Sequence, residues 1–457
     1  MWPCLVGWLD VTQPDNVTHR AYIEALADAV LGALPGVHAS LYLAAESSDF
    51  IRFNHAQVRQ ATHVTQAYVT LSLAQGQRAI QSTRTVSGDL AIDVPALLAD
   101  QLQLASDLAC LPPDPYLLLP DEVKHTTRED QGALPQASEV IDAVHRHARG
   151  LDFVGFYAGG PVVRAYADSR GQRNWHRVDS FNLEWCLYHA TDKAVKTGYS
   201  GTHWSEEAFA KRMQQAAQQV QLLARPPQTL SPGRYRAYFE PTAVGELLAT
   251  LAWGGFSRKL QETGTSPLMR LVRGEAALHA SVQLSEHTGR SSAPAFTPSG
   301  FTRPECVALV TDGLHAGSLC SPRSAREYGV LPNGATAGEA PEALHLAPGQ
   351  LPEADALKAL GTGLYLSNLH YLNYSDRQTC RLTGMTRFAC FWVEDGQLKA
   401  PLNVMRFDDD LLALFGPRLL ALTDQAQWLP DTSTYGERQL SSITTPGMLV
   451  DGFELTL

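Results

Sequence analysis

Histidine, cysteine and acidic side chains are the residues of this sequence that could do chemistry, and their spacing decides which chemistry is open to them. The closest pair of histidines is His145 and His147. Two positions apart on a helix, their side chains point in different directions, so the pair does not predict a metal site. The sequence contains no His-x-x-x-His, His-Glu-x-x-His or Cys-x-x-Cys pattern. We therefore expect no metal and no other cofactor in this chain.

Nucleophilic catalysis by a thiol would need an imidazole beside it, and the residues closest to that arrangement are Cys380, Cys390 and His370. Both thiols lie in apolar, strand-like segments. Cysteine is also among the residue types most often buried in protein cores. We therefore favour small buried side chains here, and keep an enzyme with its own nucleophile as an alternative hypothesis.

Three consecutive carboxylates, Asp408, Asp409 and Asp410, are a second feature that could suggest a bound cation. They directly precede the apolar residues of 411–415. Acidic side chains stabilise the N-terminal end of a helix, where the helix dipole is positive. We therefore expect these residues to begin a helix.

The chain is organised around residues 231–256, near its middle. Residues 234–239 have the composition of a strand, and Pro241 suits the first turn of a helix, where no N–H is needed. Four apolar residues at i, i+3, i+4 and i+7 then predict a helix with one face in a hydrophobic core, and two glycines end it. These residues are Val244, Leu247, Leu248, Leu251, Gly254 and Gly255.

A chain of 457 residues is expected to form two or three domains. Helical and strand-like segments predict an α+β domain over residues 1–112, with the proline-rich segment 111–120 as its boundary. A central α+β domain over 113–229 and a C-terminal domain over 230–457 follow. We expect an α+β fold of two lobes. The N-terminal lobe contains α/β units with antiparallel sheets, and the C-terminal lobe has a large, mostly antiparallel sheet.

The composition argues against several classes of protein. Acidic residues (47) outnumber basic residues (36), so the net charge is −11, and no block of Lys or Arg is present. Nucleic-acid binding needs clustered positive charge and is therefore disfavoured. No apolar run approaches a membrane span, and the N-terminus MWPCLVGWLDV lacks the basic residues of a signal peptide. Seven widely spaced cysteines indicate reduced thiols. We expect a cytoplasmic protein.

Three segments carry a resemblance to the TldD/PmbA family, whose PmbA member is also called TldE. Residues 231–256 are similar to the strand and helix that lead into the zinc site of TldD. Residues 361–415 resemble the C-terminal core of the family, and residues 446–457 resemble its last strand. The match covers most of the chain, but it is specific only in the C-terminal half.

The zinc site of TldD has no equivalent in this sequence. In TldD, two leucines of the helix are followed by His-Glu-x-x-x-His, and these three positions fall here on Ala249, Thr250 and Gly254. None of these residues is a zinc ligand. A further ligand of TldD, a cysteine, falls in residues 431–442, where this chain offers Tyr435. The resemblance is therefore to the metal-free PmbA/TldE branch.

The resemblance implies a function in peptide processing. In this family, TldD and PmbA/TldE pair into a heterodimeric zinc peptidase that acts on unfolded or precursor peptides such as microcins and an antitoxin. We therefore expect a non-catalytic subunit, active only with a TldD-like partner that carries the zinc. A stand-alone homodimeric peptide-binding protein without hydrolytic activity is the alternative. PmbA-like proteins have been described as modulators of DNA gyrase, but the charge of this chain does not support direct contact with DNA.

Four polar residues lie between apolar strand-like segments, beside the position of the family's cleft. They are the candidate peptide-binding residues, namely Ser375, Asp376, Arg377 and Thr379.

Overall fold

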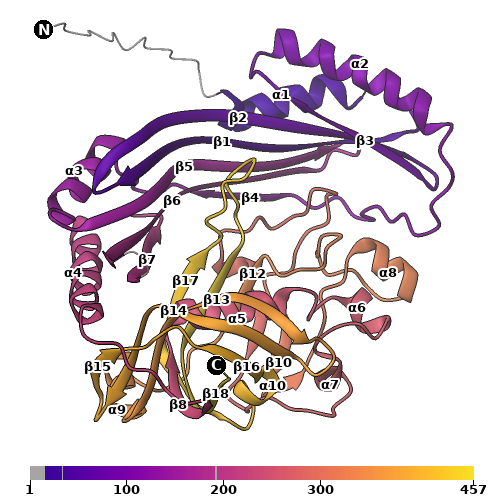
Figure 1. Cartoon of the computed structure of the whole chain (residues 1–457). Coiled ribbons are helices and arrows are strands. Elements are labelled where there is room, and N and C mark those ends of the chain that lie inside the picture. Colours follow the sequence, from indigo (N-terminus) through magenta and orange to yellow (C-terminus); the bar gives the residue numbers. More distant parts are fainter. Residues whose placement is uncertain (1–15, 33, 191–192, 457) are drawn as a thin grey trace, which may run out of the picture.

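The computed structural model describes residues 16–32, 34–190 and 193–456. The N-terminal segment judged above for a signal peptide, with Cys4, lies outside these ranges. The chain forms two lobes, each built on one β-sheet and carrying helices (Figure 1). This confirms the predicted α+β fold of two lobes.

The N-terminal lobe contains a single seven-stranded sheet in the order β3-β2-β1-β5-β6-β4, with β7 also paired to β6. All pairings are antiparallel except β4 with β6. The strands are β1 (His38–Asn54), β2 (Gln57–Gln75), β3 (Arg78–Thr85), β4 (Thr126–Asp130), β5 (Asp152–Asp168), β6 (Arg173–Ala190) and β7 (Lys193–Gly201).

The strands expected in two separate N-terminal units therefore share one sheet. The link is the long antiparallel pairing of β1 with β5, which runs from Ser40 opposite Asp168 to Asn54 opposite Val154. The boundary predicted at residues 112–113 falls in the connector between β3 and β4. Whether the two units fold independently stays a prediction.

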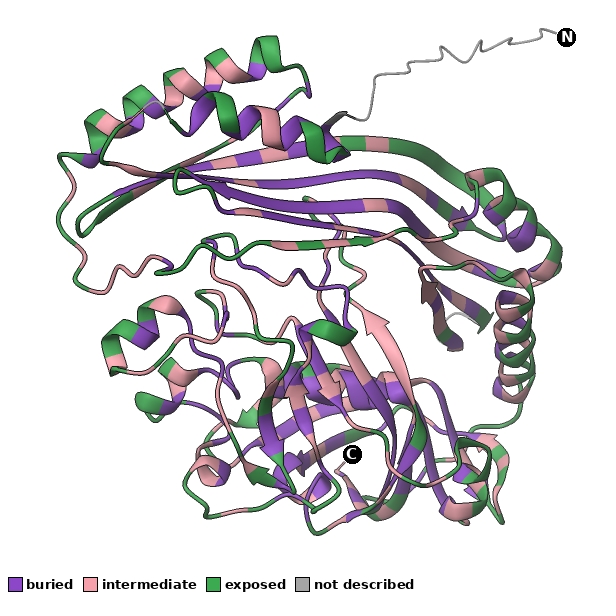
Figure 2. Cartoon of the chain, turned by 180° about the vertical axis from the view of Figure 1, so that it is seen from behind, coloured by how far each residue is buried: buried purple, intermediate pink, exposed green. Residues whose placement is uncertain are grey.

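Four helices pack on this sheet, namely α1 (Arg20–Val30), α2 (Leu90–Leu108), α3 (Ala137–His147) and α4 (Glu206–Leu223). Helices α1 and α2 lie on the face that points away from the other lobe, whereas α3 and α4 lie at one end of the sheet, where α4 also contacts β14 (Arg381–Glu394) and β15 (Gln397–Pro401) (Figure 1). Helix α4 is capped by Ser205, whose hydroxyl accepts a hydrogen bond from the backbone N–H of Ala208 at 3.2 Å. The apolar faces of these helices are buried and their outer faces exposed (Figure 2).

The C-terminal lobe contains an eleven-stranded, mostly antiparallel sheet, as predicted. Strand β8 pairs with both β13 and β18, so β8, β13, β14, β16 and β18 form a closed ring. The strands are β8 (Gly233–Phe239), β9 (Leu284–Glu286), β10 (Val307–Thr311), β11 (Leu314–His315), β12 (Ala343–Leu346), β13 (Gly363–Asp376), β14 (Arg381–Glu394), β15 (Gln397–Pro401), β16 (Arg406–Asp410), β17 (Leu419–Pro430) and β18 (Ser442–Leu455).

The helices of this lobe are short apart from one. They are α5 (Pro241–Ala252), α6 (Arg258–Glu262), α7 (Met269–Val272), α8 (Pro322–Tyr328), α9 (Ala356–Leu360) and α10 (Leu411–Leu414). Single 3-10 turns lie at Asn16–Thr18 in the N-terminal lobe and at Thr288–Arg290 and Glu353–Asp355 in the C-terminal lobe. In the described ranges, no helix is both long and apolar enough to cross a membrane.

The predicted core helix is α5, which starts at Pro241 as expected. Its apolar side is fully or almost fully buried, and the helix packs against β13 and β18. Burial of a leucine side chain contributes roughly 1.5–3 kcal/mol. The buried apolar face therefore holds α5 in the C-terminal lobe. The opposite face of the helix is not part of this core.

Candidate functional site

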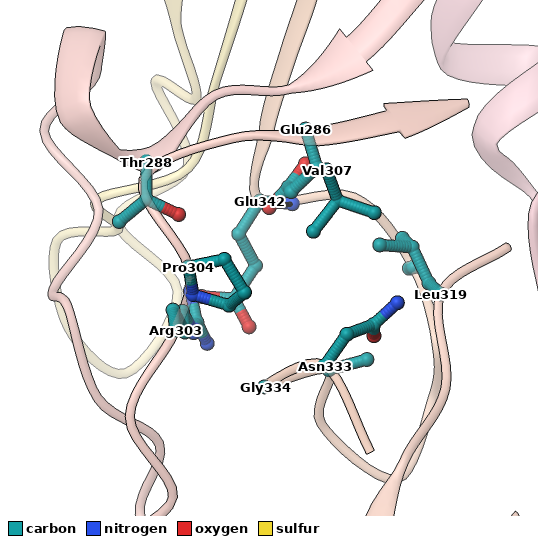
Figure 3. A pocket seen from close by; sticks show the side chains of 11 residues that line it. Glu286, Thr288, Arg303, Pro304, Val307, Leu319, Asn333, Gly334 and Glu342 are labelled. Carbon is teal, nitrogen blue, oxygen red and sulfur yellow. Dashed lines mark hydrogen bonds and ion pairs between the residues drawn. The ribbon is translucent and has the colours of Figure 1, made fainter. Parts of the chain in front are cut away.

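A small closed pocket lies between β9, β10 and the segment before β12 (Figure 3). Its volume is about 10 Å³, which is room for one water molecule. Its charged groups already have partners. The Glu286 carboxylate accepts the backbone N–H groups of Glu342 and Ala343, and Arg303 donates to Glu342 at 2.6 Å. We therefore assign this pocket a structural role.

A much larger cavity, of about 470 Å³, lies where the two lobes face each other. The N-terminal lobe contributes residues of β6, β7 and α4. The C-terminal lobe contributes α5, β17, the start of β18 and the loop between these strands. Among the lining residues are Glu184, Lys196, Gly198, Arg212, Glu246, Ala249, Asn368, Trp428, Asp431 and Ser441. We take this cavity as the candidate functional site.

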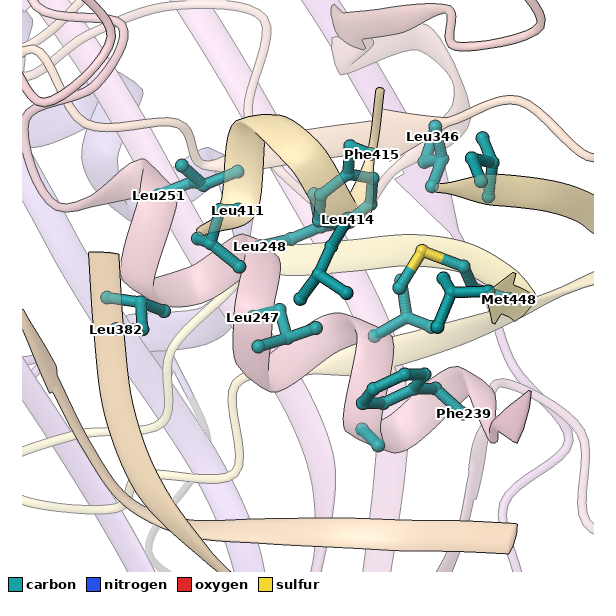
Figure 4. Close-up of a cluster of buried hydrophobic side chains, with 14 of the residues drawn as sticks. Phe239, Leu247, Leu248, Leu251, Leu346, Leu382, Leu411, Leu414, Phe415 and Met448 are labelled. Carbon is teal, nitrogen blue, oxygen red and sulfur yellow. The ribbon is translucent and has the colours of Figure 1, made fainter. Parts of the chain in front are cut away.

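The free face of α5 forms one wall of the cavity. The helix has two distinct faces, and the leucines of its other face point into the hydrophobic core (Figure 4). The cavity residues recur at helical spacing and are Thr242, Gly245, Glu246, Ala249 and Ala252. Most of them are small and carry no reactive group. From the sequence, only the core face of this helix could be predicted. Glycine and alanine carry no reactive group that would mark the other face as the wall of a cavity.

The three positions that hold the zinc ligands and the base in TldD do not form a metal site here. Ala249 faces the cavity without a donor atom. The Thr250 hydroxyl is turned back onto its own helix and donates to the Glu246 carbonyl at 3.0 Å. Gly254 lies beyond the helix end at φ +85°. A Cβ there would lie 2.4 Å from Leu260 Cδ1 and 2.7 Å from Arg377 Nη2. These residues therefore do not fit zinc.

Installing the missing ligands is expected not to create a zinc site. In the variant Ala249→His/Thr250→Glu/Gly254→His, the last residue would need a left-handed backbone and would collide with Leu260. We expect less than stoichiometric zinc by elemental analysis after dialysis, together with a lower unfolding midpoint. The single variant Ala249→His, which changes an exposed position, serves as the control. Tight binding of one zinc per chain by the triple variant would contradict this interpretation.

Glu246 is a partly buried acidic residue in the cavity wall formed by α5. One carboxylate oxygen accepts the backbone N–H of Leu369 at 2.5 Å, and the other accepts from the Asn368 side chain at 3.4 Å. Burial raises the pKa of Glu246 to about 7, while these hydrogen bonds and the charge of Lys196 act in the opposite direction. Glu246 therefore joins α5 to β13 and changes its charge near neutral pH.

The stability of a Glu246→Gln variant is expected to depend on pH differently from that of the parent. Because the pKa is higher in the folded state than its ordinary value of 4.5, the parent loses stability as pH rises from about 4.5 to about 7. Glutamine does not titrate, so the variant gains stability relative to the parent over this window, by roughly 1–3 kcal/mol. Urea unfolding at several pH values measures the difference. A constant difference between pH 5 and 8 would show that Glu246 titrates normally.

The loop between β17 and β18 closes the cavity on one side and reaches the N-terminal sheet. Arg438 in this loop is only 5% exposed and donates to the carbonyls of Gly160 at 2.9 Å and Ser180 at 2.8 Å. Its backbone N–H donates to the carboxylate of Glu46 at 3.3 Å. Tyr435, at the position matched to the TldD cysteine, is 97% exposed. Arg438 therefore anchors the loop, and Tyr435 does not face the cavity wall of α5 as a ligand would.

The four candidate peptide-binding residues lie at the end of β13 and in the turn after it, and none of them is among the residues that line the cavity. Arg377 donates to the carbonyls of Trp253 at 2.9 Å and Thr265 at 3.2 Å. Asp376 accepts the N–H groups of its own turn. Ser375 is exposed, and Thr379 is partly buried. These residues border the C-terminal end of α5, and their contact with peptide stays a prediction.

The two cysteines considered as nucleophiles are core residues. Cys380 is 0% and Cys390 is 2% exposed. Burial raises the pKa of each thiol to about 12, whereas a nucleophilic cysteine needs a lowered pKa. The ring of His370 packs on Tyr371, with centroids 4.1 Å apart. This supports the buried-thiol interpretation.

Each of the three consecutive carboxylates has a partner within the protein. Asp408 pairs with Arg381 at 2.7 Å, and Asp409 pairs with Arg418 at 2.5 Å. Asp410 caps α10 by accepting the N–H groups of its first turn. The predicted helix start is therefore confirmed, although only Asp410 provides it.

A hydrogen-bonded chain of Ser47, His63 and Asp49 lies across the paired strands β1 and β2. The Ser47 hydroxyl is 3.0 Å from His63 Nε2, and His63 Nδ1 is 2.8 Å from Asp49. This is the order of groups in a serine hydrolase. Ser47, however, is only 4% exposed, and its hydroxyl also contacts that of Thr65. A substrate carbonyl has no access to this oxygen, so we assign the chain a structural role.

The fold and the cavity define a two-lobed α+β protein in which one helix of the C-terminal lobe separates a hydrophobic core from an internal hollow. Residues 232–457 match the family described as PmbA/TldA metallopeptidase C-terminal domain. This C-terminal half of the chain belongs to the TldD/PmbA family. No match was found among curated protein sequences.

Solved structures share the fold over nearly the whole chain. TldE from Thermococcus kodakarensis has a TM-score of 0.76 and 13% identity, covering 95% of this chain and 100% of its own. A proposed modulator of DNA gyrase from Thermotoga maritima has a TM-score of 0.74 and 15% identity, covering 95% and 99%. A similarly described protein from Bacteroides thetaiotaomicron has a TM-score of 0.71 and 13% identity, covering 95% and 98%. At these identities the likeness concerns the fold.

Proposed function

We propose that this chain is a non-catalytic, PmbA/TldE-like subunit of a TldD/TldE-type metallopeptidase complex that acts on unfolded or precursor peptides. The observation that carries the proposal is the cavity wall formed by α5. Where TldD presents its zinc ligands, this chain presents Ala249 to the cavity and turns Thr250 away. The chain retains the hollow but has no ligand at these positions. We assign the zinc and the activated water to a TldD-like partner chain.

The borders of the cavity support the binding of extended peptide. In the described part of the chain, β7 pairs only with β6, and β17 pairs only with β18 apart from a bridge at Thr423. The outer edges of both strands line the cavity, through residues 196–198 and 427–430. An extended peptide adds to such an edge through main-chain hydrogen bonds, which tolerate varied side chains. Arg212 already donates to the Gly198 carbonyl at 3.1 Å, so the remaining groups of β7 would take the peptide.

The proposal is tested by mixing the purified chain with a TldD-like chain of the same organism. Light scattering after size-exclusion chromatography measures the assembly, elemental analysis measures zinc, and mass spectrometry follows cleavage of an unfolded peptide. We expect a mixed complex that cleaves the peptide, and no cleavage by this chain alone. A homodimer that binds peptide but neither joins nor activates the partner would instead establish a stand-alone binding protein. Cleavage by the lone chain in excess chelator would establish an enzyme with its own nucleophile.

A further inference from the structure

An aromatic side chain with two cations beside it lies where the two lobes meet at the cavity. Lys196, on β7 of the N-terminal lobe, has its Nζ 6.0 Å from the ring centroid of Phe388, on β14 of the C-terminal lobe. The guanidinium carbon of Arg387 lies 5.5 Å from the same centroid. Lys196 also lines the cavity. We call Lys196, Arg387 and Phe388 the cationic cluster. It contains residues of both lobes and lies at the border of the candidate site.

The two cations of the cationic cluster have no close carboxylate partner among the described residues. Within the described ranges, neither Lys196 nor Arg387 forms an ion pair with a carboxylate at 4.0 Å or less. The acidic residues that line the same cavity are Glu184, Glu246 and Asp431, and Asp431 accepts a hydrogen bond from the Ser441 hydroxyl at 3.2 Å. The carboxylate of Glu246 accepts its hydrogen bonds from residues of β13, as described above. Two cations beside the same ring, neither paired with a carboxylate, favour the binding of an anion.

The backbone that presents the cationic cluster is strained. Phe388 has φ +67°, and Tyr371 on the neighbouring strand β13 has φ +52°. Bulky residues rarely adopt these left-handed conformations, which persist mainly at functional sites. The pairing of β13 with β14 changes register at both residues, between Leu366 and Asn368 opposite Phe388 and between His370 and Asn373 at Tyr371. The strand distortion therefore places Phe388 and Arg387 opposite Lys196 instead of continuing a regular ladder.

We propose that the cationic cluster binds a carboxylate of the peptide, and that this chain selects peptides by an acidic group. The inference rests on the proposed function, because it assigns a subsite at the border of the same cavity, which Lys196 lines. The guanidinium of Arg387 can bind both oxygens of a carboxylate, and Lys196 adds a point charge from the opposite lobe. The ring of Phe388 offers an apolar surface for the methylene groups beside that carboxylate. The carboxylate belongs either to an Asp or Glu side chain or to the C-terminus of the peptide.

The test measures binding of short, fluorescently labelled, unstructured peptides to the full-length chain by anisotropy. Four peptides share one sequence, with an internal Glu or Gln and with a free or amidated C-terminus. The peptide lacking the recognised carboxylate is expected to bind about tenfold more weakly. Loss with Gln identifies the side chain, and loss on amidation identifies the C-terminus. In the variants Arg387→Gln and Lys196→Gln this preference shrinks or disappears, whereas in the control Lys211→Gln, an exposed lysine of α4, it persists.

Two results would overturn the inference, and they differ in what they say about the proposed function. If all four peptides bind with equal affinity, and the Arg387 and Lys196 variants leave that affinity unchanged, the cavity binds peptide without selecting an acidic group. If no peptide binds, either to the chain alone or to its mixture with a TldD-like partner, the proposed function fails as well. Circular dichroism of each variant confirms that a lost preference is not a lost fold.

Discussion

Replacing Arg438 with alanine is expected to lower the free energy of unfolding by about 3–5 kcal/mol, the cost of removing one member of a buried charged network. The guanidinium satisfies the carbonyls of Gly160 and Ser180 and contacts the Ser48 hydroxyl, all inside the N-terminal sheet. Without it, these oxygens lose their donor while they stay shielded by the rest of the loop. Denaturant unfolding followed by circular dichroism measures the change.

Two further variants separate the role of Arg438 from a general effect of losing an arginine. Arg438→Lys keeps the charge but cannot donate in two directions from one planar group, so an intermediate loss is expected. Arg326→Ala removes an exposed arginine of α8 and is expected to change stability by less than about 0.5 kcal/mol. Equal stability of the Arg438→Ala and Arg326→Ala variants would show that the loop is not anchored through this side chain.

Replacing Ala249 with tryptophan is expected to weaken peptide binding by roughly ten- to hundredfold, because a large side chain fills the cavity that the peptide would occupy. Ala249 lies on the cavity face of α5 and is exposed, so the larger side chain enters the hollow instead of the hydrophobic core. The unfolding midpoint is therefore expected to stay close to that of the parent. Peptide anisotropy and thermal unfolding of the same preparation measure both quantities.

The matched control is Gln215→Trp, which adds the same side chain at an exposed position of α4 outside the cavity lining. This variant is expected to bind peptide like the parent. Full peptide binding by the Ala249→Trp variant would place the peptide elsewhere, and the end of β13 with Ser375, Asp376 and Arg377 would then be the next surface to test.

The sequence was most informative where one residue pattern has one structural meaning. Pro241, the spaced leucines and the glycines of residues 231–256 specify both ends of α5 and its core face, and the structure confirms each of them. The α+β class followed from the same kind of local pattern. The single N-terminal sheet did not, because the pairing of Ser40 with Asp168 joins strands that are distant in sequence and that carry no mark of their partner.

The candidate site was only partly predictable for a related reason. The absence of zinc ligands at Ala249 and Gly254 is evident from the sequence. The cavity could not be predicted, because it depends on how the two lobes face each other. Lys196 and Arg387 are ordinary charged residues in the sequence, and only the fold brings both to the ring of Phe388. Polar residues between apolar strands suggested the end of β13 instead, which contacts the helix but does not line the cavity.

The anchoring of the β17–β18 loop has a consequence for the order in which the protein is made. Arg438 contacts Ser180 and Ser48, which precede it by 258 and 390 positions in the chain. During synthesis, every strand of the N-terminal sheet is therefore complete long before this arginine leaves the ribosome. The polar groove that receives Arg438 stays open to water throughout that interval. The contacts that this loop makes between the lobes can form only when translation is almost finished, so a chain truncated before residue 438 would leave the cavity without one of its walls.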